Sequence, residues 1–170
     1  GYLGTVEPLK MHRDYVAMSA AVDIPGVRFQ VFGSGDGFSS LKEQARQIGA
    51  ADRFEFCGYA EDIARVFAQM DLFGYPLCED NYSTSELVVQ EALYAGVPPV
   101  VFCDGGAAML VRHSQTGFVV HSAREYKEAL EYLYRCPEER RRLALAARAY
   151  ARERLGAERT ARQFMQLYQE

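Results

Sequence analysis

Short apolar runs alternate with longer amphipathic segments from one end of the chain to the other. The apolar runs predict β-strands. These strands are expected at residues 2–4, 27–32, 53–57, 72–77, 99–102 and 117–120. Between them, apolar residues recur three and four positions apart, which predicts helices. The helices are expected at residues 12–22, 39–48, 62–70, 84–94, 107–112, 122–135, 137–154 and 157–169.

This alternation predicts an α/β fold, a Rossmann-like three-layer domain in which helices cover both faces of one parallel sheet of about six strands. A C-terminal helical tail follows the last strand. The 170 residues are expected to form a single domain, since a chain of this size can bury a good core. In open parallel sheets, ligands bind beyond the carboxyl ends of the strands. The glycine-rich, polar or charged segments of the chain lie just after predicted strands, at 5–10, 33–37, 58–62, 78–86 and 104–107.

Composition changes this interpretation little. Hydrophobic residues make up 49% and charged residues 25% of the chain, as in ordinary globular domains. No apolar stretch approaches the ~20 residues that span a bilayer, and nothing resembles a signal peptide. Because residues 1–4 already resemble a strand running into a loop, the chain is expected to be cut from a longer protein. The cysteines lie in or beside apolar runs without a CxxC pair, which predicts buried free thiols in a reducing, cytoplasmic compartment: Cys57, Cys78, Cys103 and Cys136.

Charge is distributed unevenly along the chain. The formal net charge is −4, yet residues 124–170 carry 11 basic and 8 acidic side chains. Such a basic segment could contact nucleic acid or anionic lipid. Its arginines alternate with glutamates and alanines at helical spacing, and aromatic residues do not interleave with them, so a solvated helix face is the better interpretation. We therefore expect no nucleic-acid partner.

A glycine-rich turn follows the second predicted strand. Gly33, Gly35 and Gly37 alternate with Ser34 and Asp36, directly before a predicted helix. Glycines at this place would let the backbone approach an anion at the helix N-terminus. The third glycine of a dinucleotide fingerprint would fall on Phe38, so the pattern is not that fingerprint. A tight strand-to-helix turn without a ligand explains it nearly as well.

The segment Ser83-Thr84-Ser85-Glu86 has the spacing of a capping box at the start of a helix. Its simplest interpretation is helix capping. In addition, the backbone N–H groups of residues 84–86 and the helix dipole would form a pocket for a diphosphate. The preceding Glu79 and Asp80 supply carboxylates suited to binding sugar hydroxyls.

Glu91 lies in the middle of the same predicted helix, among apolar residues. A carboxylate in such a setting is unfavourable unless it is exposed or paired with hydrogen-bond donors. It is either an exposed glutamate on a two-sided helix or a carboxylate that faces the crevice and binds a ribose diol. The physical chemistry of the sequence alone does not favour one of these two interpretations of Glu91 over the other.

The run STSELVVQEALYAGVPPVV over residues 83–101, followed by Gly105-Gly106 and Thr116-Gly117, resembles the signature of the family 4 (group 1) glycosyltransferases. Members of that family have two Rossmann-like domains in the GT-B arrangement, and the signature lies in the second. The resemblance covers nearly the whole chain. It implies that residues 1–170 are the C-terminal, nucleotide-sugar-binding half and that the N-terminal acceptor domain is absent.

The resemblance also implies roles for individual residues. Glu91 matches the family's ribose-binding glutamate, and Lys10 matches the lysine that neutralises the donor diphosphate. The family's sugar-contacting glutamate would fall on Ser83, and its arginine on Thr5, so the chain departs from the pattern twice. Lys10 and Glu91 are thus the expected catalytic residues. The expected donor pocket consists of Gly4, Thr5, Gly33, Gly35, Tyr59, Glu79, Asp80, Ser83, Thr84, Ser85, Glu86 and Glu91, with Glu79, Asp80 and Glu86 as the candidate replacements for the missing glutamate.

The activity that the resemblance implies is transfer of a sugar from a nucleoside diphosphate donor to an acceptor, with retained anomeric configuration. No metal or other cofactor is expected, since Lys10 and the amides of residues 84–86 would carry the charge of the leaving diphosphate. The three histidines suggest no general base. Peripheral membrane association is expected only through the absent half.

Two alternatives to this assignment stay open. One is a fragment of a GT-B sugar-nucleotide epimerase, and the other is a non-catalytic nucleotide-sugar-binding module. The isolated chain is expected to bind a nucleotide without transferring sugar. In the resembling family the last helix packs on the first domain, and Phe164, Leu167 and Tyr168 would form the apolar stripe that does so here.

Overall fold

The computed structural model describes residues 1–82 and 86–168 of the chain. The six strands are β1 (Tyr2–Leu3), β2 (Phe29–Phe32), β3 (Phe54–Gly58), β4 (Phe73–Tyr75), β5 (Pro99–Phe102) and β6 (Phe118–Val120). The helices are α1 (Tyr15–Ala20), α2 (Phe38–Gln47), α3 (Ile63–Phe67), α4 (Leu87–Ala95), α5 (Gly106–Leu110), α6 (Ala123–Arg135), α7 (Pro137–Arg154) and α8 (Ala157–Leu167), with a 3₁₀ turn at Ala51–Arg53. Each predicted strand and helix therefore has a counterpart in the described part, mostly shorter than expected.

The strands form two three-stranded parallel sheets, in the orders β1-β2-β3 and β4-β5-β6. The prediction of one sheet of about six strands was wrong on this point. β1 and β4 do lie side by side, because the amino group of Gly1 donates to the Leu72 carbonyl over 2.8 Å and the Gly74 amide donates to the Gly1 carbonyl over 2.9 Å. With β1 only two residues long, this contact stays too short to continue the hydrogen-bond ladder from one sheet to the other.

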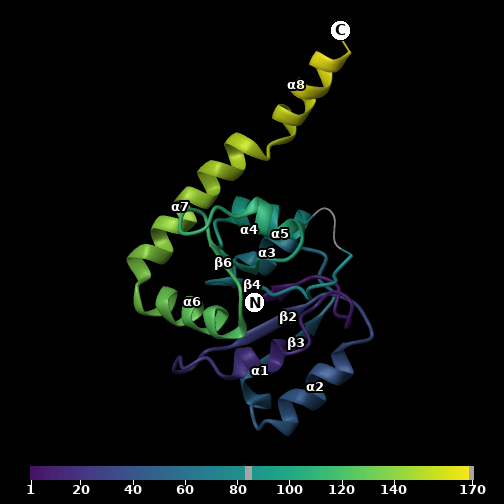
Figure 1. Ribbon diagram of the computed structural model, residues 1–170, viewed down its shortest axis with the longest axis vertical. Helices are drawn as coiled ribbons and strands as arrows, with labels where there is room; N and C mark the ends of the chain where they lie inside the picture. The colour runs from purple at the N-terminus through teal and green to yellow at the C-terminus, as the bar shows by residue number, and fades with distance from the viewer. Residues whose placement is uncertain (83–85, 169–170) are drawn as a thin grey trace.

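Helices cover both faces of the strands (Figure 1). α1 packs against α2 and α6 on one side, and α4 packs against α3, α5 and α7 on the other. All four residues of β5 are buried, and Val100 and Val101 have no exposed surface. A parallel strand that is covered on both faces is expected to be apolar throughout, which explains why this strand was recognisable in the sequence.

The outer helices form the tail. Both the Nε and a terminal nitrogen of Arg148 in α7 donate to the Ala95 carbonyl, at 3.0 and 2.6 Å, and so cap the C-terminus of α4. α8 then projects away from the body of the domain (Figure 1). Phe164 and Tyr168 of the predicted stripe are exposed, as is Met165; the side chain of Leu167 lies outside what the structure describes. No helix in the described residues is long and apolar enough to cross a membrane.

The predicted burial of all four cysteines was wrong. Cys57 and Cys103 are exposed, while Cys78 and Cys136 are partly covered. Cys57 lies in β3 at the edge of its sheet, where one strand face is left open. Cys103 follows β5 directly and lies in a loop at the carboxyl edge. A neighbouring apolar run is therefore a poor guide to burial at the edge and at the ends of strands.

Candidate functional site

The order of the strands points to the loops that follow β1 and β4 as the place for a ligand. β2 and β3 lie on one side of β1, whereas β5 and β6 lie on the far side of β4. The direction in which strands are added thus reverses between β1 and β4, and in doubly wound sheets ligands bind at the carboxyl edge at such a point. The residues that surround this edge form the candidate site.

Backbone contacts hold these two loops together. The Cys78 amide donates to the Lys10 carbonyl over 2.9 Å, and the His12 amide donates to the Pro76 carbonyl over 3.0 Å. Met11 and Leu77 form an antiparallel bridge between the same segments. The backbone of Lys10 is therefore held against the chain that continues from β4.

Two predicted site residues, Lys10 and Glu86, contact Tyr75, the last residue of β4. Its side chain is fully buried, and its hydroxyl donates to Glu86 Oε2 over 2.6 Å. The Nζ atom of Lys10 lies 6.0 Å from the centre of the Tyr75 ring, within the range of a cation–π contact. Burial raises the pKa of Tyr75 well above its ordinary value, so the hydroxyl keeps its proton and acts as the donor. Tyr75 was missed in the sequence, where it looked like an ordinary apolar strand residue.

Glu86 does not have the role that the capping box predicted. α4 begins at Leu87, and the Glu86 side chain makes no capping hydrogen bond although it occupies the N-cap position. Instead the side chain turns inward, with 2% of its surface exposed. Oε2 accepts from Tyr75, whereas the buried Oε1 has no hydrogen-bond partner among the described residues. The Tyr75 hydroxyl thus binds the carboxylate that was expected to take part in the cap, and the rest of the predicted capping box, residues 83–85, lies outside the described residues.

The loop after β4 also connects to the neighbouring loops. The Tyr82 hydroxyl donates to a Glu7 carboxylate oxygen in the loop after β1, and this contact raises the pKa of Tyr82. On the other side, Asn81 Nδ2 donates to the Cys78 carbonyl over 2.7 Å. A Cβ atom at Gly105, after β5, would lie 3.0 Å from the same Nδ2 atom. Three loops thus converge at the carboxyl edge, and the sequence carried no signal for the pairing of Glu7 with Tyr82.

The glycine-rich turn packs directly on the loop after β1. The Val6 amide donates to the Ser34 carbonyl over 2.8 Å. A Cβ atom at Gly33 would lie 1.7 Å from the Gly4 carbonyl oxygen, and one at Gly35 would lie 2.3 Å from the Val6 carbonyl oxygen. The Cα atoms of these two glycines therefore face protein backbone. This close approach explains the glycines without a ligand.

Glu91 lies on the exposed face of α4. Val89, Ala92 and Leu93 of the same helix are buried, while Leu87 and Glu91 are exposed. Partial desolvation raises the pKa of the Glu91 carboxyl. Glu91 makes no hydrogen bond or ion pair with the residues that the structure describes, so its carboxylate is available to a ligand.

The other predicted residues lie around the rim. Thr5 is next to the core, because its carbonyl accepts from the Tyr2 hydroxyl over 2.8 Å. Tyr59, Glu79 and Asp80 are exposed in the loops after β3 and β4. The predicted diphosphate pocket cannot be placed, since Ser83, Thr84 and Ser85 lie outside the described residues. Within the described part, no group of three or more histidine, cysteine, aspartate or glutamate side chains could hold a metal ion.

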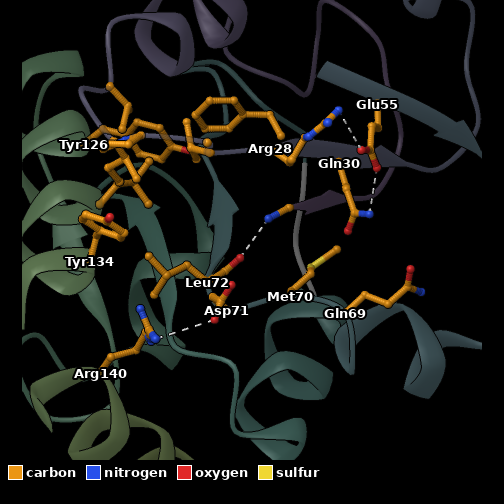
Figure 2. A pocket seen from close by; sticks show the side chains of 18 of the residues that line it. Arg28, Gln30, Glu55, Gln69, Met70, Asp71, Leu72, Tyr126, Tyr134 and Arg140 are labelled. Atoms are coloured by element: carbon orange, nitrogen blue, oxygen red, sulfur yellow. Dashed lines mark hydrogen bonds and ion pairs between the residues drawn. The ribbon is translucent and has the colours of Figure 1, made fainter. Parts of the chain in front are cut away.

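A cavity lies at the opposite end of the strands, at their amino ends (Figure 2). It has a volume of about 420 Å³, and its lining includes Gly1 and Leu72. Ion pairs lie at its edges, between Arg140 and Asp71 at 3.7 Å and between Arg28 and Glu55 at 3.3 Å. Large apolar cavities are the usual first candidates for ligand sites. This cavity lies at the amino ends of the strands, whereas ligands of parallel sheets bind beyond the carboxyl ends. We therefore assign the candidate site to the carboxyl edge.

Comparison with known proteins identifies the class. Residues 2–150 match the family described as glycosyl transferases group 1. A D-inositol 3-phosphate glycosyltransferase of Rhodococcus erythropolis is 30% identical, with 98% of this chain and 40% of that protein covered. A 2-deoxystreptamine N-acetyl-D-glucosaminyltransferase of Streptomyces fradiae is 31% identical, with 62% of this chain and 26% of that protein covered. The chain therefore belongs to the group 1 glycosyl transferase family.

A solved structure shows the same fold. The Anabaena protein HepE in complex with UDP superimposes with a TM-score of 0.88 over 99% of this chain and 48% of its own, at 22% identity. The same protein has also been solved with UDP-glucose. This chain thus spans less than half the length of these relatives, and the expected Rossmann-like fold and group 1 family are both confirmed.

Proposed function

We propose that this chain is the nucleotide-sugar-binding half of a retaining GT-B glycosyltransferase. The observation that carries the proposal is the convergence of Lys10 and Glu86 on Tyr75, at the carboxyl edge where the order of the strands reverses. Lys10 brings a positive charge, and Glu86 brings a hydrogen-bond acceptor. A nucleoside diphosphate sugar needs both, because its diphosphate is anionic and its sugar carries hydroxyl donors.

In this proposal the Lys10 ammonium stabilises the diphosphate as it leaves. The bond between the anomeric carbon and the diphosphate oxygen breaks, the acceptor oxygen bonds to that carbon on the same face, and the acceptor hydroxyl passes its proton to the departing diphosphate. Negative charge accumulates on the diphosphate, and a fixed cation nearby lowers the energy of that transition state. Glu91, exposed on α4 and without a partner in the described residues, would accept hydrogen bonds from the ribose diol. No metal is assigned to this step.

The acceptor would be bound by a second domain outside these residues. Support comes from the length of the relatives, of which this chain covers 26% to 48%. A nucleotide-binding module without transfer activity is the second candidate, because Thr5 and Ser83 replace the arginine and the glutamate that the family pattern expects.

A thermal-shift panel with UDP, GDP and ADP tests the proposal. A ligand that binds only the folded chain raises the melting temperature. At a ligand concentration 100 times Kd, binding adds about 2.7 kcal/mol to the free energy of unfolding. We expect one nucleotide to stabilise the chain and no sugar transfer by the 170 residues alone. Stabilisation by none of the three would contradict nucleotide binding, and detectable transfer would contradict the assignment as half an enzyme.

A further inference from the structure

Glu7 and Lys10 lie on one turn of the loop after β1. The amides of Lys10 and Met11 both donate to the Glu7 carbonyl, over 3.1 and 3.0 Å, so residues 7–11 form a single helical turn. Side chains three positions apart on such a turn are neighbours, and a glutamate and a lysine with this spacing attract each other. The local structure alone therefore predicts an ion pair between Glu7 and Lys10.

That ion pair does not form among the described residues. The Glu7 carboxylate accepts instead from the Tyr82 hydroxyl, and the Lys10 ammonium lies 6.0 Å from the centre of the Tyr75 ring. Elsewhere in the described part of the chain, acid–base pairs with the same spacing do form ion pairs, at 2.7 and 2.6 Å: Glu43 with Arg46 and Glu139 with Arg142. A residue of another loop thus keeps Glu7 from its neighbour on the turn.

The turn after β4 brings Tyr82 to Glu7. This turn begins at Cys78, whose amide donates to the Lys10 carbonyl over 2.9 Å. The Asn81 side chain closes the turn by donating to the Cys78 carbonyl over 2.7 Å. The contact with Glu7 raises the pKa of Tyr82, so the Tyr82 hydroxyl keeps its proton at neutral pH and donates it to the hydrogen bond. The backbone contact that fixes Lys10 therefore also fixes the turn that carries Tyr82.

The position of Glu7 matters because this loop has few basic residues. Thr5 stands where the family pattern has an arginine, so Lys10 is the basic residue of that pair that the chain keeps. An ion pair with Glu7 would offset the charge of Lys10 and bring a carboxylate next to an incoming diphosphate, which would repel it. The Tyr82 hydroxyl binds the same carboxylate without using a cation.

We propose that Tyr82 is a positioning residue that holds Glu7 away from Lys10 and so keeps the lysine ammonium free for the diphosphate. The inference rests on the proposed function, and it adds a residue that acts on the donor through Lys10 rather than by touching the donor. Without the Tyr82 hydroxyl, Glu7 turns to Lys10 and competes with the ligand for the ammonium. Without the charge of Glu7, Tyr82 is no longer needed for binding.

The test is a double-mutant cycle on nucleotide binding. Calorimetry gives Kd for UDP and for uridine, or for whichever nucleotide the wild-type chain selects and its nucleoside. Tyr82→Phe should weaken UDP binding by about two- to fivefold, the range that corresponds to an exposed ion pair, and leave uridine binding unchanged. Glu7→Gln should bind UDP at least as tightly as the wild-type chain, since glutamine still accepts from Tyr82 but has no charge to pair with Lys10.

The double variant separates positioning from a purely structural role. With Glu7→Gln and Tyr82→Phe combined, Kd for UDP should return to the wild-type value, because no carboxylate is left to pair with Lys10. If Tyr82 served only to join the two loops, the double variant would bind UDP as weakly as Tyr82→Phe or more weakly. In a Lys10→Ala background, Tyr82→Phe should have no further effect on Kd for UDP.

Two variants at other places serve as controls. Tyr134→Phe removes the hydroxyl of a tyrosine that is also exposed and that lines the cavity at the amino ends of the strands. Glu138→Gln removes a carboxylate charge from an exposed position in α7. Neither should change the ratio of Kd for UDP to Kd for uridine. Tyr82 is itself exposed, so Tyr82→Phe should fold and melt close to the wild-type temperature.

The outcomes distinguish this inference from the proposed function. Wild-type chain that binds no nucleotide overturns both. If the wild-type chain binds a nucleotide and Tyr82→Phe leaves its Kd unchanged, or weakens nucleotide and nucleoside equally, the inference alone is overturned. The same holds if Glu7→Gln fails to restore nucleotide binding in the Tyr82→Phe variant.

Discussion

The Lys10 ammonium lies 6.0 Å from the centre of the buried Tyr75 ring, on an edge of the domain where backbone hydrogen bonds join the loops after β1 and β4. The cation is therefore held near the candidate site without a carboxylate partner among the described residues. A lysine that already formed a close ion pair would attract an incoming anion less strongly, because its charge would be largely neutralised. This arrangement leads to the first prediction.

Lys10→Ala should weaken the binding of UDP by about 1–3 kcal/mol, the range for hydrogen bonds that involve a charged group. The affinity for uridine should hardly change, because the ammonium acts on phosphate oxygens. Calorimetry with both ligands measures the difference, which should shrink at high salt because ions screen partly exposed charges. Lys42→Ala, on the exposed side of α2, is the control. Equal losses for UDP and uridine would remove Lys10 from the diphosphate site.

Glu91→Gln should weaken nucleotide binding by about 1–3 kcal/mol and leave the free energy of unfolding nearly unchanged, because the side chain is exposed and unpaired within the described residues. Desolvation raises the pKa of Glu91, so the carboxylate is lost on acidification at a higher pH than an ordinary glutamate. Nucleotide affinity should therefore start to fall above the usual titration range of glutamate in the wild-type chain, and not in the variant. Unchanged affinity with lowered stability would identify Glu91 as a structural residue.

Gly33→Ala should destabilise the fold by about 3 kcal/mol or more, from strain at positive φ and from overpacking. The φ angle of Gly33 is +139°, and a Cβ atom there would lie 1.7 Å from the Gly4 carbonyl oxygen. Gly49→Ala is the matched control, since Gly49 also has a positive φ, of +70°, but a Cβ atom there would meet no other atom within 4 Å. Urea denaturation should show a loss of only about 1–2 kcal/mol for this control. Similar losses for both would show that the close approach of the two loops is unimportant.

Glu131→Gln should lower stability at neutral pH and have little effect in acid. Glu131 Oε1 accepts from Lys127 Nζ over 2.6 Å and from the Asp23 amide over 2.7 Å. These contacts, the lysine first, lower the pKa of Glu131. A lowered carboxyl pKa means that the unfolded chain binds more protons than the folded one, so the contribution to stability exists above the ordinary pKa of glutamate and disappears as the pH falls through the lowered value. The difference in melting temperature between wild type and variant should shrink from pH 7 to acid; a constant difference would contradict this assignment.

The sequence by itself determined the order of the elements and the edge at which to look for a site. Strands such as β5 are apolar throughout because both faces are covered, and this property is visible in a run of adjacent residues. The helices follow from the spacing of apolar residues along the chain. The match of Glu91 to the family pattern was likewise visible, because Glu91 lies within a local run of residues, and Lys10 was matched by its place after the first predicted strand.

Only the tertiary structure decided how those elements meet. The division into two sheets depends on the short contact of Gly1 with Leu72 and Gly74, residues far apart in the chain. The role of Glu86 changed from helix cap to buried acceptor because the Tyr75 hydroxyl lies next to it. Local patterns describe what a residue can do. Which partner a side chain contacts depends on long-range packing. That packing brings together residues that are distant in the sequence, so a short stretch of sequence does not show which of several possible hydrogen bonds forms.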